Sequence, residues 1–116
     1  MHKQHETLTT GVLRRNNNTV AAHVEVANFS PYHVREVTVY FFNWDTTPPT
    51  LIASFPISMP PSSNTPLDVD ITSDHYEVRI LREHEDVLVN CYGRDSNFVF
   101  QEGNTVLFKD LVEISK

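Results

Sequence analysis

Hydrophobic and polar residues alternate with a period of two along most of this chain, which is the pattern of β-strands with one buried face. The first two such segments each gather their apolar residues on one face: Val20, Ala22, Val24 and Val26 in residues 20–26, and Val37, Val39 and Phe41 in residues 37–42. Because turn-forming residues lie between them, we predict that the two segments pair as an antiparallel hairpin. His23 falls on the polar face of the first segment, where we expect a solvated or interface side chain.

Alternation or short apolar runs predict further strands at 50–55, 67–72, 76–81, 87–92, 98–101, 105–108 and 111–114. Residues 74–90 also allow a helix, but the β-branched Val78 and Val89 favour strands there. The dipeptide Gly103-Asn104 is a favoured two-residue hairpin turn, so we expect it to join the strands on either side.

Prolines gather in residues 56–66, where four of the seven fall. Because proline cannot donate a ladder hydrogen bond, we expect an edge strand or an extended loop there. Together these segments predict an all-β fold, a two-sheet antiparallel sandwich of about eight or nine short strands, of jelly-roll or immunoglobulin-like type. We divide the chain into an N-terminal arm or connector, 1–18, and the β-sandwich domain, 19–116.

The chain has 116 residues, enough for one core. Its net charge of −6 argues against a partner recognised by phosphate neutralisation, so no nucleic acid is expected. No apolar run approaches the ~20 residues that span a bilayer, so we expect no membrane partner. The first ten residues lack an apolar segment, so we also expect no secretory signal peptide.

Catalytic and cofactor-binding patterns are missing from the sequence. The six histidines show no paired ligand spacing, and Asp68 and Asp70 fit a solvated strand face better than a calcium loop. There is no Gly-x-Ser-x-Gly elbow, and three glycines cannot form a phosphate-binding loop. Cys91 lies in an apolar run, which is typical of a buried thiol. We therefore expect no enzyme, no cofactor and no metal.

Aromatic residues form a stripe on the face of the second segment that points away from the expected core. This candidate contact face consists of Tyr40, Phe42 and Trp44, and Phe98 with Phe100 makes a second stripe. Aromatic stripes on strands are rarely left in water, so either loops cover these residues or they form a contact surface.

The N-terminal segment contains a short β-prone piece, residues 8–15, ahead of a flexible Asn16-Asn17-Asn18 hinge. Such an arm can pair within its own sheet or with a sheet edge of another copy by β-augmentation. The residues that we assign to this assembly arm are Leu8, Thr10, Val12, Leu13 and Arg14.

A short all-β sandwich with a β-prone arm resembles the subunits of bacterial endospore appendages, which are jelly-roll pilins. The resemblance implies that residues 1–15 match the N-terminal connector that reaches into neighbouring subunits. It also implies a helical homopolymer on the spore or cell surface, extracellular, together with an anchoring protein there. Residues 1–18 contain no cysteine, unlike the connectors of the best-described pilins, so any assembly of this chain would be non-covalent.

The leading hypothesis is a structural, self-assembling fibre subunit that polymerises through its arm and through contacts between sandwich faces. One alternative is a monomeric module that presents Tyr32, Tyr40, Trp44 or the loop 45–50 to a carbohydrate or a protein. Another is a small phage or virion structural protein, which would use the same assembly physics.

Overall fold

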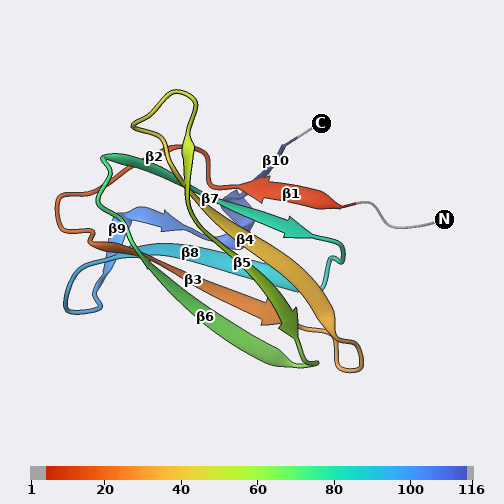
Figure 1. The fold of residues 1–116 in the computed structure, drawn as a ribbon. Coiled ribbons are helices and arrows are strands. Elements are labelled where there is room, and N and C mark those ends of the chain that lie inside the picture. The colour runs from red at the N-terminus through yellow and green to blue at the C-terminus, as the bar shows by residue number, and fades with distance from the viewer. Residues whose placement is uncertain (1–4, 115–116) are drawn as a thin grey trace.

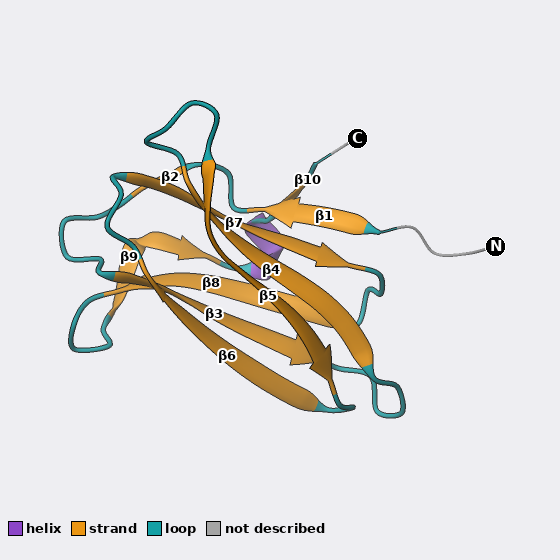
Figure 2. Cartoon of the chain, in the orientation of Figure 1, coloured by secondary structure: helices purple, strands orange, loops and turns teal. Residues whose placement is uncertain are grey.

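Alternating side chains produce two antiparallel sheets that pack face to face in the computed structural model, which describes residues 5–114 (Figures 1 and 2). These residues form ten strands and one turn of 3-10 helix, η1 (Phe108–Asp110). The strands are β1 (Glu6–Thr9), β2 (Leu13–Arg14), β3 (Ala21–Asn28), β4 (Arg35–Asn43), β5 (Thr50–Met59), β6 (Ser63–Asp70), β7 (His75–Arg82), β8 (Val87–Arg94), β9 (Phe100–Val106) and β10 (Val112–Glu113). The predicted two-sheet antiparallel sandwich is confirmed.

The larger sheet, sheet A, has the strand order β10-β1-β7-β4-β5, with β2 also paired to β7. The smaller one, sheet B, has the order β6-β3-β8-β9. Strands β4 and β5, β3 and β6, and β1 and β7 form nested antiparallel pairs. In these nested pairs, each pair encloses the next one along the chain. A long hairpin that folds over on itself, as in a jelly roll, gives this arrangement.

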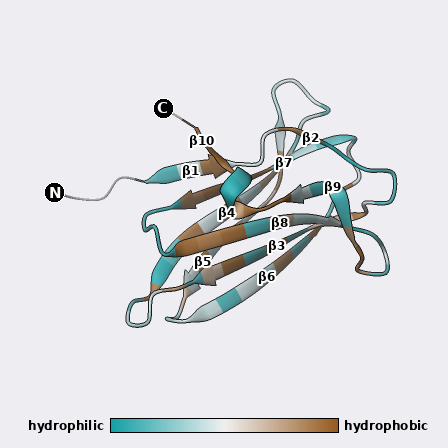
Figure 3. Cartoon of the chain, turned by 180° about the vertical axis from the view of Figure 1, so that it is seen from behind, coloured by the Kyte–Doolittle hydropathy of each residue, from teal (hydrophilic) through white to brown (hydrophobic). Residues whose placement is uncertain are grey.

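The core lies between the sheets and is built from the alternating residues that the sequence singles out. Val24 and Val26 of sheet B and Val39 and Phe41 of sheet A are fully buried, and teal and brown segments alternate along β3 and β6 in Figure 3. Val20 departs from the expectation, because it precedes β3 and is 41% exposed.

The predicted hairpin between residues 20–26 and 37–42 is wrong. β3 pairs with β6 and β8 in sheet B, whereas β4 pairs with β5 and β7 in sheet A. The connection crosses from one sheet to the other. Alternation identifies which face of a strand is buried, but two strands that bury the same face can pack across the core as well as side by side.

The predicted turn at Gly103-Asn104 is also wrong, because both residues lie inside the irregular strand β9. Asn104 is 1% exposed and its side chain bonds to the chain segment before β3, which a turn residue in solvent could not do. Residues 98–99, expected to begin a strand, lie in the loop before β9.

The proline-rich segment forms two edge strands joined by a short turn, which agrees with the edge-strand expectation. Pro56 lies in β5, at one edge of sheet A, and Pro66 lies in β6, at one edge of sheet B. Residues 74–90 contain strands β7 and β8, so the strand prediction there is confirmed. In residues 5–114, no helix is long and apolar enough to cross a membrane.

Candidate functional site

The N-terminal segment pairs with its own sheet in this chain. β1 lies between β7 and β10, so that the strands nearest the two termini run side by side (Figure 1). Leu8 is 5% exposed and belongs to the core. Beside it, the Thr9 hydroxyl donates to the Glu77 carboxylate, and the Arg82 guanidinium donates to Glu6 over 2.8 Å. Residues 1–4 of the expected arm lie outside the described residues.

The other residues assigned to the arm occupy different surroundings. The Val78 amide donates to the Thr10 hydroxyl over 3.1 Å, and Leu13 of β2 packs against the core. Val12 is 49% exposed, and Arg14 of β2 is also exposed. Between β1 and β2, Gly11 takes a left-handed conformation with φ +73°, where side chains are disfavoured.

Asn104 fixes the chain just after β2, and the sequence did not reveal this role. Its side-chain oxygen accepts from the Asn16 amide and from the Thr19 hydroxyl, each over 2.8 Å, and its amide nitrogen donates to the Arg14 carbonyl over 2.9 Å. Gly93 of β8 makes room for this approach. Consequently the N-terminal segment is anchored by Asn104 at residues 14–19, whereas before that point it is held by strand pairing with β7, by Leu8 in the core and by the side-chain contacts of Glu77 and Arg82.

The candidate contact face predicted from the sequence lies on the outer side of sheet A. The rings of Tyr40 and Phe42 stack with centroids 6.2 Å apart, and the Arg79 guanidinium lies 4.6 Å above Phe42. Trp44 donates its indole N–H to Glu77 over 2.7 Å. All three aromatic residues of the face are half-buried, so neighbouring side chains cover part of it.

Glu77 lies under this face and is 2% exposed. Burial alone would raise the pKa of its carboxyl group, but hydrogen bonds from Arg79, Thr9 and Trp44 outweigh that effect and lower the pKa below its ordinary value. Glu77 is therefore ionised and links β1 to the aromatic face.

A second cluster, which the sequence did not reveal, covers the outer side of sheet B. His23 is 7% exposed rather than solvated. Its Nδ1 lies 3.0 Å from Asp68, its Nε2 contacts Glu25, and its ring stacks on Phe100 with centroids 5.4 Å apart. Only the pairing of β3 with β6 brings Asp68 opposite His23, and no spacing in the sequence signals that partner.

The surroundings of His23 favour the protonated form of its ring. Burial alone would lower its pKa, but hydrogen bonds and charge attraction from Glu25 and Asp68 outweigh burial and raise the pKa above 6.5. A neutral ring has only one N–H, so it can donate to only one of the two carboxylates.

We predict that unfolding free energy falls as the pH rises from about 6.5 through the raised pKa of His23. The sign follows because a folded-state pKa above the unfolded value stabilises the fold only while the ring is protonated. His23→Gln should abolish this fall and cost about 1–3 kcal/mol at pH 6, as expected for leaving buried polar groups unpaired. Urea unfolding at several pH values measures both effects. His75→Gln, which alters a half-exposed ring beside Asp45, is the control; a fall that persists in His23→Gln would contradict the assignment.

Other chemistry finds little support in residues 5–114. No group of three or more His, Cys, Asp or Glu side chains in this part of the chain could hold a metal ion. The Cys91 thiol is 2% exposed, as its apolar run predicted, and burial raises its pKa to about 12. A thiol in that state is not a nucleophile near neutral pH.

The described residues therefore offer a docked N-terminal strand and two aromatic outer faces as the features from which a function can be argued. Comparisons with protein-family models, with curated proteins and with solved structures found no match for this chain.

Proposed function

We propose that this chain is a structural subunit that assembles non-covalently with other copies of itself into a fibre. Copies would exchange their N-terminal strands and make contacts between sandwich faces. The resemblance to endospore appendage subunits supports a place on a spore or cell surface, with an anchoring protein as a further partner. No catalytic role is part of the proposal.

The single observation that carries the proposal is the position of β1. It is a terminal strand that places one core residue, Leu8, into the sandwich and pairs with β7 over four residues. Each of these contacts would be the same if β1 came from another copy, so exchange costs little beyond association itself. Gly11 follows β1 with no heavy atom within 4 Å of an added Cβ, which leaves room for the chain to change direction there.

Asn104 limits the part that can be exchanged. Because it holds residues 14–19 to β9, the exchanged piece would be β1 and the residues that follow it, at most as far as Leu13. Exchange between sandwiches would then need only a short connector, which favours close packing of successive subunits.

The aromatic outer face of sheet A supplies a second contact area. Leu51 pairs with Phe42 across β4 and β5 and is 54% exposed. Together with Tyr40 and Phe42 it forms an apolar area on a sheet face, of the kind that marks protein contacts.

A cross-link between β1 and β7 tests strand exchange. Leu8 and Ile80 point into the core, so Thr7 and Leu81, which are also Cα partners, point outward. The Thr10 amide donates to Val78 over 3.1 Å, so by alternation the Thr7–Leu81 pair is a non-hydrogen-bonded one with Cα atoms ~4.5 Å apart, which suits a disulfide.

We expect assemblies of the double variant Thr7→Cys/Leu81→Cys to give a ladder of covalent multimers on a non-reducing gel after oxidation. Cys91 is buried and should not take part. Thr38→Cys/Leu81→Cys is the matched control, because it joins β4 to β7 inside one sheet and should give only monomers. Monomers alone from the β1–β7 pair would contradict strand exchange. A deletion of the arm is less informative, since it also removes Leu8 from the core.

Tyr32 favours a second candidate function, a module that binds a carbohydrate or protein as a monomer. Its side chain is 83% exposed in the loop between β3 and β4. A fluorescence titration that responds to a sugar in the native chain but not in Tyr32→Ala would support this function. Trp44 is a weaker contact residue, because Glu77 already accepts its indole N–H.

A further inference from the structure

Phe98 is exposed at the tip of a rigid loop and has an unfavourable backbone conformation. Its φ is 63°, a region that bulky residues rarely adopt, and 58% of its surface is exposed. The Asp95 carboxylate accepts from the Asn97 and Val99 amides, over 2.9 and 2.8 Å, and holds the loop in place. The Phe98 ring lies on its own sheet face, with the Arg94 guanidinium 3.9 Å from its centroid and the His23 ring centroid 6.3 Å away, and the rest of the ring is open to solvent. A strained conformation that holds an apolar ring on this face points to a use for that ring.

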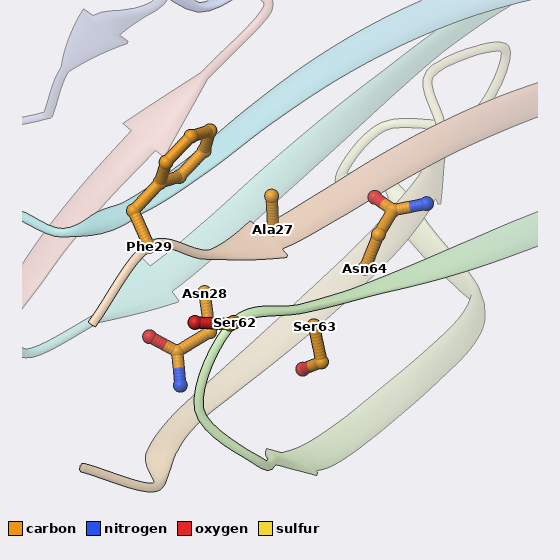
Figure 4. Close-up of a pocket in the computed structure, with 6 residues that line it drawn as sticks. All are labelled: Ala27, Asn28, Phe29, Ser62, Ser63 and Asn64. Atoms are coloured by element: carbon orange, nitrogen blue, oxygen red, sulfur yellow. The ribbon is translucent and has the colours of Figure 1, made fainter. Parts of the chain in front are cut away.

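A pocket of about 350 Å³ lies at the other end of the same sheet. Figure 4 shows Ala27 between Phe29 and Asn64 on one side of the chain. Phe29 is 63% exposed at the rim. The remaining lining residues are Asn28, Ser62 and Ser63. The pocket therefore combines a small apolar floor at Ala27 and one aromatic wall with polar sides, and it is open to solvent.

The Phe98 loop and the pocket lie on one face, the outer face of sheet B. Ala21 pairs with Arg94, just before the loop, and Ala27 pairs with Asn64 at the pocket. Six residues of strand separate these points, or roughly 20 Å. The ring therefore cannot reach the pocket of its own chain.

Charge on this face is nearly balanced, although the whole chain carries −6. In β3, β6 and β8, Arg94 donates to Asp68 over 2.7 Å, and the His23 imidazolium lies between Asp68 and Glu25. Asp70 and, in β9, Glu102 are the remaining charged residues of sheet B, so most of the charges in its strands are paired and two carboxylates are left over. Two such faces can meet without the repulsion that the rest of the surface would cause.

The face is large enough for a specific contact. Three strands of eight residues and one of seven, about 4.8 Å apart and rising about 3.3 Å per residue, give a face of about 500 Å². Two faces then bury about 1,000 Å², which is the lower bound for a biological interface.

We propose that two copies pack through the outer faces of their B sheets, related by a twofold axis perpendicular to the strands. This axis places Phe98 of each copy in the pocket beside Ala27 of the other. A contact in which the same patch serves both partners is the commonest in homo-oligomers. The inference rests on the proposed self-assembly and supplies the second surface that a growing polymer needs besides the exchanged strand.

A pair of complementary variants tests the contact by sedimentation and fluorescence energy transfer. Phe98→Asn removes the ring and its contacts with Arg94 and His23 but suits the left-handed backbone, so the monomer should melt close to the wild type. Ala27→Trp fills the pocket. Each variant alone should weaken association about 100-fold, roughly tenfold for each of the two lost contacts. In a mixture of the two variants, the Phe98 ring of an Ala27→Trp copy can still enter the open pocket of a Phe98→Asn copy. The mixture should therefore associate more tightly than either variant alone.

Cysteine cross-linking distinguishes the two outer faces. Pro66 is exposed, outward-facing and near the proposed axis, so a bismaleimide that spans about 10 Å, the distance between packed sheet faces, should link two copies of Pro66→Cys. Pro56→Cys is its counterpart on the edge strand of sheet A. Linkage confined to Pro56→Cys, a monomeric wild type, or unchanged association of Phe98→Asn would overturn the proposal. A monomeric wild type would also overturn strand exchange. The other two results do not bear on whether the β1–β7 pair gives a covalent ladder, so strand exchange is then judged separately.

Discussion

Gly93→Ala is expected to destabilise the protein by ~4 kcal/mol or more, a large part of the roughly 5–15 kcal/mol that holds a typical domain folded. A Cβ at Gly93 would lie 2.5 Å from the Asn104 Cβ and 3.0 Å from the Thr19 side chain. Asn104 could move away only by breaking its buried hydrogen bonds to Asn16, Thr19 and Arg14. Overpacking costs about 1–3 kcal/mol, and each buried partner left unpaired adds about as much.

Urea denaturation followed by circular dichroism measures this effect. Gly103→Ala is the matched control, because an added Cβ would meet nothing nearer than the Asn16 side chain at 3.8 Å; it should change stability by ~0.5 kcal/mol or less. A Gly93→Ala protein as stable as the control would show that Asn104 does not fix the N-terminal segment. If Asn104 does fix it, the variant should also exchange amide hydrogen faster in β2 than the wild type.

Asn28→Asp is the second substitution with a large expected effect, also ~4 kcal/mol or more at neutral pH. Asn28 is 2% exposed. Its amide nitrogen shares two hydrogens among the carbonyls of His33, Met59 and Pro60, at 2.9, 3.1 and 3.0 Å. A carboxylate in that position would direct negative charge at carbonyl oxygens and could donate to none of them.

The effect should depend on pH, because a carboxyl group buried among acceptors has a raised pKa and can donate once it is protonated. We therefore expect the destabilisation to shrink as the pH falls towards about 4. Asn97→Asp, at an exposed loop position, is the control and should change stability little at any pH. Equal stability of the two variants at pH 7 would contradict the role given to Asn28.

Asn28 also explains why the chain crosses between the sheets where it does. The residue ends β3 in sheet B, and its side chain binds the carbonyl of Met59, which ends β5 in sheet A. The residues after Asn28 are thereby turned towards sheet A rather than back along sheet B. A side chain with at least two N–H hydrogens is needed to donate to these carbonyls. In the sequence, Asn28 stands only among the turn-forming residues between the first two strand segments.

The in-or-out assignment of residues was largely predictable because it depends on neighbours along the strand. The residues that alternation assigns to the core are buried there, as Val24, Val26, Val39 and Phe41 show. Cys91 follows the same rule. Alternation assigns Tyr40 and Phe42 to the outer face of their strand, and both lie there, half-buried.

Strand partners were not predictable from the same pattern. Alternation is satisfied equally well whether β4 lies beside β3 or across the core from it, so the choice of sheet depends on contacts between distant residues. The same is true of His23, whose surroundings depend on Asp68, 45 positions away. Gly103-Asn104 has the local chemistry of a turn, but Gly93 and Thr19 offer Asn104 a buried position that outweighs this preference.

By itself, then, the sequence determined the class of fold and most residues of the core, because those follow from local periodicity and composition. Tertiary structure decided which strands share a sheet, that β1 fills a place in its own sheet, and that His23, Phe98 and Ala27 lie on one face. Hydrogen-bond partners and surfaces of this kind come from segments far apart in the chain. Local pattern carries no information about which distant segments meet, and the free energy of the whole packed arrangement decides it.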